Sequence, residues 1–535
     1  SMKKSLLLKI VSVVFAVVAF VGLANAQVTT SSMTGTVKDS KDGLPGASFK
    51  ATHTPTGSVY TVITNSVGRF TIGNMRVGGP YSIEVSFVGF KTQKINDVYL
   101  KLGEAFVLNV TLQDNSSTLN EVKIVGASTN PIMNSNKSGS STVVNRQEIQ
   151  NLPTISRSVN DITRLTPQAN GTNIGGGNYR SNNFTVDGSN FNNMFGIGSN
   201  VPANGAPISI DALEQISVNV TPYDVRQSGF TGGAVNAVTR SGTNDFSATA
   251  FYLMRSQNEQ GQKIGDYTIG NVQPFNQKQY GVSIGGPIIK NKLFFFANAE
   301  FNKQEAPGQA RIAATPSTPF GTNDAVARPT ADFLNQVKSY LMSTYNYDPG
   351  VYQGYGQLSN NDKFLVRLDW NISKSHRFNV RYNQVESKSP SFVSTSRSPL
   401  SGFSNGAGRT DRNALWFSNS NYYQEANLYS WSAELNSSFG SKFSNVLRGS
   451  YSHQNDPRSS ESSIFPFVDI LDGSGVPLTS FGYEPFTSGN LRDVKSYSIT
   501  DNFTMALGKH NITLGGQLEF NTTKNGFQRF ATSYY

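Results

Sequence analysis

Apolar and polar residues alternate one by one over long stretches in the second half of the chain. In the stretch 293–302, Leu293 and Phe295 fall on one face, and Asn298 and Glu300 fall on the other. A period of two predicts a β-strand, because successive side chains of a strand point to opposite faces of the sheet. The same pattern recurs in four further stretches, at 363–372, 377–383, 429–436 and 512–521. We therefore predict about nine long antiparallel strands after residue 245.

One face of these predicted strands carries charged residues, among them Lys363, Arg367 and Asp369. An Arg or Lys side chain in the middle of a bilayer costs roughly 2–4 kcal/mol, so in a membrane this face must meet water while the other meets lipid. We interpret Asp362 and Asp369 as carboxylates solvated in a watery lumen. The alternative is a soluble β-sandwich with one solvated face.

The connections between the predicted strands alternate between short and long. They are short at 440–442 and 508–510, and long at 306–361 and 388–421. Short turns on one side and long loops on the other are typical of membrane β-barrels, so we favour the barrel. Plugged barrels contain roughly 22 strands, and we therefore expect this barrel to be incomplete and the chain to be a fragment.

The first residues read as an export signal. Met2, Lys3 and Lys4 precede the apolar run 13–23, and Ala24-Asn25-Ala26 follows it. A basic start, a short apolar run and a small-residue motif predict cleavage between Ala26 and Gln27. We find no later stretch in the sequence with the length and apolar character of a transmembrane helix.

Short alternating runs separated by glycine-containing turns follow between residues 34 and 112. They predict a small β-sandwich with strands at 34–38, 47–53, 59–64, 69–72, 81–88 and 105–112. We expect His53 to be an exposed strand residue, since no other His or Glu stands at metal-binding spacing from it.

Several motifs in this region resemble the carboxypeptidase regulatory-like (transthyretin-like) domain. They are Gly35-Thr36-Val37, Leu44-Pro45-Gly46-Ala47, Gly68-Arg69-Phe70 and the segment from Tyr81 to Phe90. The resemblance implies a β-sandwich that is not a peptidase, of the kind found ahead of Bacteroidetes-type transporters.

The middle of the chain combines strands, short helices and glycine-rich loops. We predict strands at 213–220 and 234–239, helices near 146–149 and 159–162, and loops at 170–183 and 191–206. Two motifs here, at 184–188 and 221–236, resemble the plug of TonB-dependent outer-membrane transporters, in the form of the Oar-like branch. The matching residues are Val186, Asp187, Gly188, Tyr223, Asp224, Val225, Arg226, Gly229, Phe230, Gly232, Gly233 and Asn236.

A β-prone segment lies between the predicted sandwich and the predicted plug. It resembles the TonB box of this family, and its residues are Leu119, Glu121, Val122, Lys123, Ile124 and Val125. An extended segment in a flexible setting can add as a strand to the sheet edge of a partner. The alternative is that it forms the first strand of the plug.

These observations predict a mainly β protein: an N-terminal transthyretin-like β-sandwich, an α+β plug and the first part of a large antiparallel transmembrane β-barrel. The expected boundaries are 1–26 for the signal, 27–113 for the sandwich, 114–127 for the linker, 128–242 for the plug and 243–535 for the barrel. The resemblance implies a receptor in the bacterial outer membrane that imports an extracellular ligand with energy from a TonB-type protein. Its other contacts would be outer-membrane lipid and lipopolysaccharide.

Enzymatic chemistry is not indicated, and we expect neither a cofactor nor a metal site. The chain has no cysteine, and its four histidines are isolated in the sequence. The match 402–406 to G-x-S-x-G lacks the strand and helix that a nucleophile elbow requires. The net charge of +10 is scattered along the chain, so nucleic-acid binding is not expected.

Two alternatives to import by this branch remain open. The first is a surface protein for adhesion or for secretion of protein cargo, with loops such as 409–423 binding a partner. The second is a SusC-like glycan importer with a SusD-type lipoprotein partner, which is less favoured because the segment 223–230 departs from the SusC form. The sequence does not identify the ligand.

Overall fold

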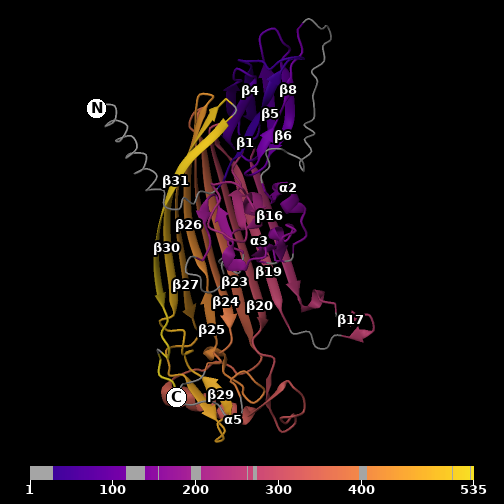
Figure 1. Ribbon diagram of the computed structural model, residues 1–535. Helices are drawn as coiled ribbons and strands as arrows, with labels where there is room; N and C mark the ends of the chain where they lie inside the picture. Colours follow the sequence, from indigo (N-terminus) through magenta and orange to yellow (C-terminus); the bar gives the residue numbers. More distant parts are fainter. Residues whose placement is uncertain are drawn as a thin grey trace, which may run out of the picture.

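The computed structural model describes residues 28–115, 139–154, 156–170, 172–193, 206–261, 263–268, 274–396, 407–508, 510–530 and 532–535. In these residues the chain forms a small sandwich, an α+β unit and a tall curved sheet, arranged one beside the next (Figure 1). The α+β unit lies against the concave side of the tall sheet, and the sandwich lies at one end of it. The predicted mainly β fold class is confirmed.

The sandwich consists of two four-stranded sheets packed on a shared apolar core. The first has the order β4-β1-β7, with β8 also paired to β1: β1 (Ser31–Lys38), β4 (Arg69–Met75), β7 (Ala105–Val107) and β8 (Val110–Thr111). The second has the order β3-β2-β5-β6: β2 (Ser48–His53), β3 (Ser58–Ile63), β5 (Gly78–Ser86) and β6 (Gln93–Leu100). The sequence missed β6, whose burial departs from strict alternation at Asn96 and Asp97.

The expectation that His53 is exposed was wrong. Counting along β2, His53 falls on the same inward face as Phe49 and Ala51, and it is only 6% exposed. Its Nδ1 atom shares a 2.7 Å hydrogen bond with the Thr56 hydroxyl. Burial, helped by the nearby Arg76 charge, lowers the pKa of His53 to about 3.

The α+β unit, here called the plug, is built on a sheet with the order β13-β12-β15-β14-β9. Its strands are β9 (Ser141–Asn145), β12 (Asn183–Val186), β13 (Ser189–Asn190), β14 (Leu213–Asn219) and β15 (Ala234–Thr239). Both predicted helices are present, as α2 (Arg146–Asn151) and α3 (Val159–Thr163). A capping box between Asn145 and Glu148 satisfies backbone donors at the start of α2. The predicted loop 170–183 contains part of the hairpin β10 (Ala169–Asn170) and β11 (Asn173–Ile174), and the turn η1 (Tyr179–Ser181).

The tall sheet has ten antiparallel strands in the order β16-β19-β20-β23-β24-β25-β27-β30-β31, with β26 between β24 and β27. Since β25 and β26 both pair with β24 and β27, they act as one strand interrupted at Ala426. The bounds are β16 (Ser247–Ser256), β19 (Asn276–Ile289), β20 (Leu293–Pro307), β23 (Gly356–Asn371), β24 (His376–Ser391), β25 (Tyr422–Glu425), β26 (Asn427–Phe439), β27 (Phe443–Ser459), β30 (Leu491–Leu507) and β31 (His510–Gly526).

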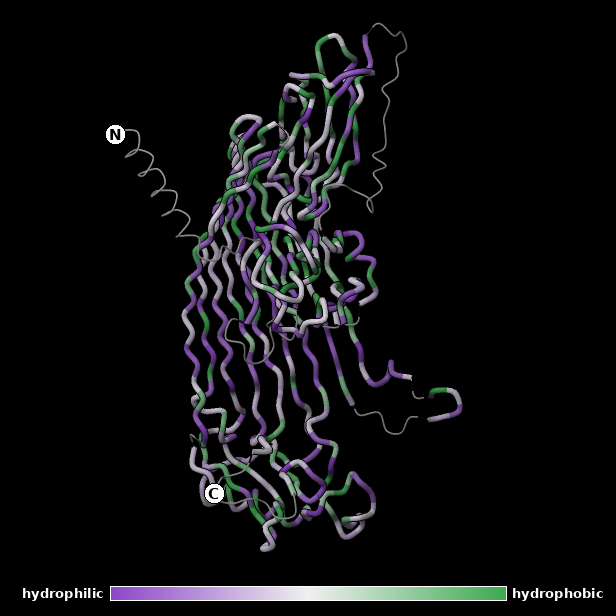
Figure 2. Tube along the Cα trace, in the orientation of Figure 1, coloured by the Kyte–Doolittle hydropathy of each residue, from purple (hydrophilic) through white to green (hydrophobic). Residues whose placement is uncertain are grey.

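The two faces of the tall sheet differ as the alternation predicts. In β23, Lys363, Arg367 and Asp369 are buried on the face toward the plug, whereas Phe364 and Trp370 are more than 40% exposed on the other face. Figure 2 shows hydrophilic and hydrophobic positions interleaved along these strands. The charged face is therefore the one that packs against the plug. Asp369, however, is paired with arginines rather than solvated, which corrects the sequence interpretation.

The long connections gather at the end of the tall sheet opposite the sandwich and fold into a cap (Figure 1). The cap contains the helix α5 (Ala331–Tyr345) and has an apolar core that includes Leu334, Leu415 and Phe481. Its strands are β21 (Ile312–Ala314), β22 (Val326–Thr330), β28 (Val468–Leu471) and β29 (Pro477–Phe481), with the turn η5 (Ser418–Ser420). The sequence showed these connections only as long loops.

Shorter elements complete the described chain. They are the turns η2 (Ile210–Ala212) and η3 (Gln257–Glu259) and the hairpin β17 (Lys263–Ile264) with β18 (Tyr267–Thr268). Among the described residues, no helix combines the length and apolar character needed to cross a membrane.

Candidate functional site

The turn between β12 and β13 points the side chain of Asp187 at the plug-facing side of the tall sheet, which we call the wall. Asp187 and Gly188 both have positive φ angles, 45° and 73°. Asp-Gly is favoured in such a two-residue turn, because aspartate tolerates this conformation and glycine adopts it without strain. A side chain at position 188 would also collide with the guanidinium of Arg448 in β27. The Asp-Gly motif therefore lets the plug approach the wall closely.

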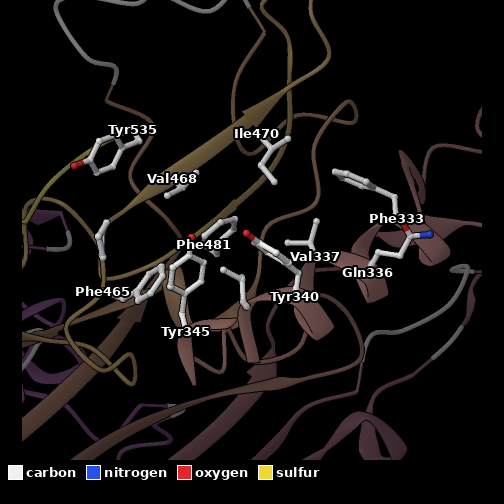
Figure 3. Close-up of a pocket in the computed structure, with 12 residues that line it drawn as sticks. Phe333, Gln336, Val337, Tyr340, Tyr345, Phe465, Val468, Ile470, Phe481 and Tyr535 are labelled. Carbon is white, nitrogen blue, oxygen red and sulfur yellow. The ribbon is translucent and has the colours of Figure 1, made fainter. Parts of the chain in front are cut away.

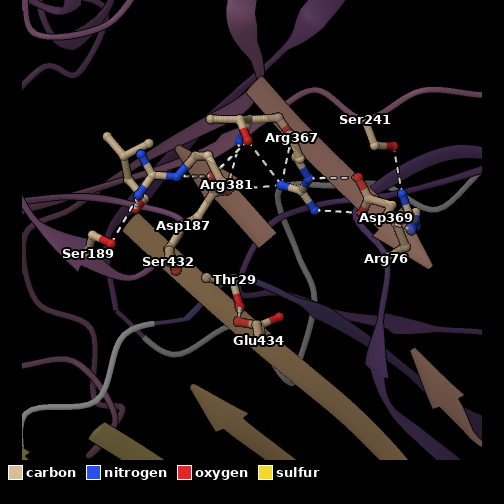
Figure 4. Close-up of polar contacts among 12 residues, drawn as sticks. Thr29, Arg76, Asp187, Ser189, Ser241, Arg367, Asp369, Arg381, Ser432 and Glu434 are labelled. Atoms are coloured by element: carbon tan, nitrogen blue, oxygen red, sulfur yellow. Dashed lines mark hydrogen bonds and ion pairs between the residues drawn. The ribbon is translucent and has the colours of Figure 1, made fainter. Parts of the chain in front are cut away.

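The Asp187 carboxylate joins two strands of the wall to the plug sheet (Figure 4). Its Oδ1 atom lies 3.2 Å from Arg367 Nη1 of β23, and its Oδ2 atom lies 2.9 Å from Arg381 Nε of β24. It also accepts hydrogen bonds from Thr239 of β15, from the backbone N at 2.9 Å and from the hydroxyl at 2.7 Å. We call Asp187, Thr239, Arg367 and Arg381 the plug seat.

The register of the wall explains why an anion is needed in the plug seat. Arg367 and Arg381 are direct cross-strand partners in the β23–β24 ladder, and like charges in this position repel. Both residues are buried, so water screens the repulsion poorly. The Asp187 carboxylate lies close to both guanidinium groups and compensates their charge.

The charge network continues from the plug seat towards the sandwich. Arg367 donates two hydrogen bonds of 2.9 Å to the Asp369 carboxylate. The Oδ1 atom of Asp369 also lies 3.1 Å from Nη2 of Arg76, which follows β4 of the sandwich. Arg76 in turn donates to the Ser241 hydroxyl at 2.6 Å, just after β15. One chain of alternating charges thus touches the wall, the plug and the sandwich (Figure 4).

A second buried ion pair joins the plug to the wall at Glu300 of β20. Lys363 Nζ lies 2.6 Å from Glu300, and the hydroxyl of Ser209 in the plug donates to the same carboxylate at 2.5 Å. Apolar contacts accompany these polar ones, because the plug core extends onto Phe296 and Leu365 of the wall. The contact between the plug and the wall is therefore partly apolar and partly ionic.

The predicted glycines Gly232 and Gly233 lie just before β15, where they pack closely against Ile174 of β11. A side chain on Gly232 would contact the Ile174 carbonyl, and one on Gly233 would collide with the Ile174 side chain. Asn236 is buried in β15, where it accepts a 2.9 Å hydrogen bond from the Thr185 hydroxyl. The side chain of Val186, at the end of β12, is fully buried.

The predicted loop residues 223–230 lie at the other end of the plug sheet. Asp224 and Arg226 form an ion pair of 2.9 Å, and Gly229 adopts a φ of 79°. Tyr223 and Val225 are 85% and 82% exposed, and Phe230 is partly exposed. The structure therefore separates the predicted motif into a buried part, which includes Asp187 and Asn236, and an exposed loop.

Several predicted residues lie outside the described part of the chain. These are the candidate coupling segment Leu119, Glu121, Val122, Lys123, Ile124 and Val125, the cleavage site Ala26 and Gln27, and the serine motif 402–406.

Sequence reasoning missed Arg367 and Arg381 as partners of Asp187, and Arg76 as a partner of Asp369. It placed the two barrel arginines on the lumen face, but their pairing depends on the β23–β24 register, which the sequence does not show. That loop 409–423 binds a ligand or partner stays a prediction, although one of its basic side chains is already engaged within the chain. The Arg409 side chain is buried and holds Asp469 through two contacts of 2.7 Å.

The cap contains a cavity of about 710 Å³ between α5 and the β28–β29 hairpin (Figure 3). Its lining is mostly apolar and includes the rings of Phe333, Tyr340, Tyr345, Phe465, Phe481 and Tyr535. Such a cavity can hold an apolar or aromatic group. Within the described ranges no group of three or more His, Asp or Glu side chains is placed to hold a metal ion.

Comparisons with known proteins agree with this architecture. Residues 238–534 match the outer membrane beta barrel domain family, and residues 32–113 match the carboxypeptidase regulatory-like domain family. The chain is 26% identical over 395 residues to the TonB-dependent transporter Oar of Myxococcus xanthus, covering 70% of this chain and 35% of the relative. It thus spans about a third of the curated relative that it matches.

Similarity to a solved outer-membrane transporter supports the fold. The outer membrane transporter YddB from Escherichia coli is 12% identical, with a TM-score of 0.50 over 72% of this chain and 48% of the other. The siderophore receptor PirA from Acinetobacter baumannii is 14% identical, with a TM-score of 0.42 over 72% of this chain and 48% of the other.

Proposed function

This chain belongs to the outer membrane beta barrel domain family and is homologous to TonB-dependent transporters, and on that basis we propose that it forms the gated part of an importer. An extracellular ligand binds at the cap side, and a TonB-type protein then displaces the plug from the lumen. The homologues support a location in the outer membrane and a role other than catalysis. The apolar outer face of the strands would meet lipid, with lipopolysaccharide around the cap.

The plug seat is the observation that carries this proposal. Asp187, Arg367 and Arg381 are buried, yet each can be solvated when the plug moves. A buried ion pair adds little net stability, because the cost of removing charges from water offsets most of their attraction. The seat therefore fixes the position of the plug without making its displacement prohibitively unfavourable.

The coupling step is assigned to the segment from Leu119 to Val125. It stands directly before the plug in the sequence and resembles the TonB box. A β-prone segment can pair with the edge of a partner sheet, and the backbone hydrogen bonds then transmit tension along the chain.

Deletion of residues 119–125 from the full-length protein tests the proposal. We expect cells with this deletion to bind the cargo at their surface but not to deplete it from the medium, as measured by comparing spent media with those of wild-type and null strains. A deletion of residues 128–134, which has the same length, serves as the control and should retain uptake. Uptake that survives removal of 119–125 would contradict TonB coupling, and cargo accumulating outside wild-type cells would indicate secretion.

The cap cavity is a second element of the proposal. Its aromatic lining and its position at the end of the lumen opposite the sandwich suit a first contact with a ligand that carries an apolar or aromatic group. A SusD-type lipoprotein is not part of this proposal.

A further inference from the structure

The sandwich is fastened to the plug by a junction with its own buried contacts. The Gln215 side chain of β14 donates to the Leu100 carbonyl at 2.9 Å and accepts from the Leu102 backbone N at 2.8 Å. Val77 and Leu102 of the sandwich pack on Val238 of the plug, and all three are buried. The plug thus meets the sandwich through a buried surface in which Gln215 recognises the sandwich backbone.

Arg76 is the charged part of this junction, and the sandwich holds it in place. Its backbone N donates to the Tyr60 hydroxyl at 3.1 Å, and its carbonyl accepts from the Tyr81 hydroxyl at 2.6 Å. The guanidinium then reaches Asp369 of the wall and Ser241 of the plug–barrel connection. Because Asp369 also holds Arg367, two ion pairs in series, Arg76–Asp369 and Asp369–Arg367, link the sandwich to the plug seat.

The sandwich also holds the wall directly. The Thr29 hydroxyl, just before β1, donates to Glu434 of β26 at 2.7 Å and accepts from Arg448 of β27 at 2.7 Å. On the other side, the Tyr60 ring lies under Arg377 of β24, with 4.0 Å from the guanidinium carbon to the ring centre. These contacts hold the sandwich against several strands of the wall at once, so it bridges the wall and the plug.

We propose that the sandwich is a lock on the plug, and that the plug leaves its seat only after the sandwich undocks at Arg76 and Leu102. This inference rests on the proposed displacement of the plug. The candidate coupling segment lies in the sequence between the sandwich and the plug, so tension on it acts on both bodies. Release of the sandwich thus becomes the step that decides whether a pull on the segment opens the lumen.

Hydrogen exchange in the full-length protein tests the lock with Arg76→Gln. The amides of Asp187 and Thr239 report on the seat, since they donate to the Ala237 carbonyl and to the Asp187 carboxylate. We expect both to exchange roughly tenfold faster in the variant, because local opening sets the exchange rate. Arg69→Gln is the matched control, since Arg69 lies exposed in the same sandwich and its exchange pattern should equal that of the wild type.

A cross-link separates loss of the lock from misfolding of the sandwich. The chain has no cysteine, so Glu104→Cys and Ser141→Cys, whose native side chains lie 3.1 Å apart across the junction, can be joined by a short bis-maleimide. In the Arg76→Gln background the cross-link should restore slow exchange at Asp187 and Thr239.

The proposal is overturned if Arg76→Gln leaves the seat amides as slow as in the wild type. It is also overturned if the cross-link fails to restore them while the amides of Phe49 and Val85 stay protected. Neither hydrogen-exchange readout involves cargo. If transport proves independent of residues 119–125, the proposed function is wrong, but the exchange test of the lock still gives a valid result.

Discussion

The core of the sandwich and the plug seat are equally buried but opposite in chemistry. Phe49 in the sandwich is fully buried and stacks on Phe70, with 4.0 Å between the ring centres. In the seat, Arg381 is fully buried as well, and Asp187 is 4% exposed. Burial alone therefore does not distinguish a permanent core from the contact between two bodies.

The difference lies in what water can do at each place. Burial of apolar surface stabilises a protein by roughly 25 cal/mol per Å². Separating the two sheets of the sandwich would lose this stabilisation completely. Ion pairs exchange protein partners for water at a small net cost, but an unpaired charge left inside is severely destabilising. The plug seat is therefore stable when all its charges are paired, and the plug can leave it at a small net cost when every charge becomes solvated. Removing one charged side chain while its partners stay buried is strongly destabilising.

The largest effect is expected from Phe49→Ala in the sandwich core. Loss of a buried phenyl ring costs about 3–5 kcal/mol, since a cavity remains where Phe49 packed on Phe70. Chemical denaturation, monitored by hydrogen exchange of the amides in β2 and β5, measures the loss in free energy of unfolding. Ile63→Ala is the control, because this side chain is mostly exposed. A small effect of Phe49→Ala would show that the sandwich does not depend on this core.

A somewhat smaller effect is expected from Asp187→Asn in the seat. The change leaves Arg381 without its carboxylate partner and opposite Arg367, whose remaining partner Asp369 is shared with Arg76. We expect the free energy of opening, measured by the exchange of plug amides, to fall by about 3 kcal/mol. A second change, Arg381→Met, should restore part of this loss in the Asp187→Asn background, because it removes the repulsion. If the double variant is less protected than the single one, charge compensation is not what Asp187 provides.

The contrast between the two regions also shows what the sequence could predict. Alternation in β20, β23 and β26 gave the strands and the faces, because a period of two follows directly from backbone geometry. The helices α2 and α3 were predicted from local signals alone. The family resemblance singled out Asp187 and Gly188, and the structure places both in the turn that meets Arg367 and Arg381.

The partners of the motif could not be predicted, because they depend on register and docking. Arg367 and Arg381 become neighbours only when β23 and β24 pair in one particular register. Arg76 lies 293 residues away from Asp369 in the sequence, and nothing local marks it as a partner. His53 was misplaced for a related reason, because its hydrogen bond with Thr56 makes a polar residue acceptable inside the sandwich.

The stability of the sandwich should depend on pH through His53, which extends the comparison with the plug seat. The pKa of His53 falls from 6.5 to about 3 on folding, so below pH 6.5 the unfolded chain binds a proton that the folded one does not. Stability is therefore full above pH 7 and is lost as the pH falls towards 3. Between pH 7 and pH 5 we expect a loss of about 2 kcal/mol in urea denaturation.

His53→Gln provides the control for this pH effect, since glutamine does not titrate. The variant starts from a lower stability at pH 7, because the fit to Thr56 and Tyr81 is disturbed, but its stability should change less between pH 7 and pH 5. A pH slope equal to that of the wild type would assign the effect to carboxylates elsewhere.

The smallest effect is expected from Asp324→Asn in the cap, which makes the same chemical change as Asp187→Asn at an exposed ion pair. Asp324 lies 3.6 Å from Arg412, but its side chain is fully exposed, and the Arg412 side chain is 48% exposed. Water solvates both groups before and after the change, so neither the melting temperature nor the exchange of plug amides should shift measurably. A shift that matched the one from Asp187→Asn would mean that net charge, and not a buried unpaired arginine, determines how firmly the plug is seated.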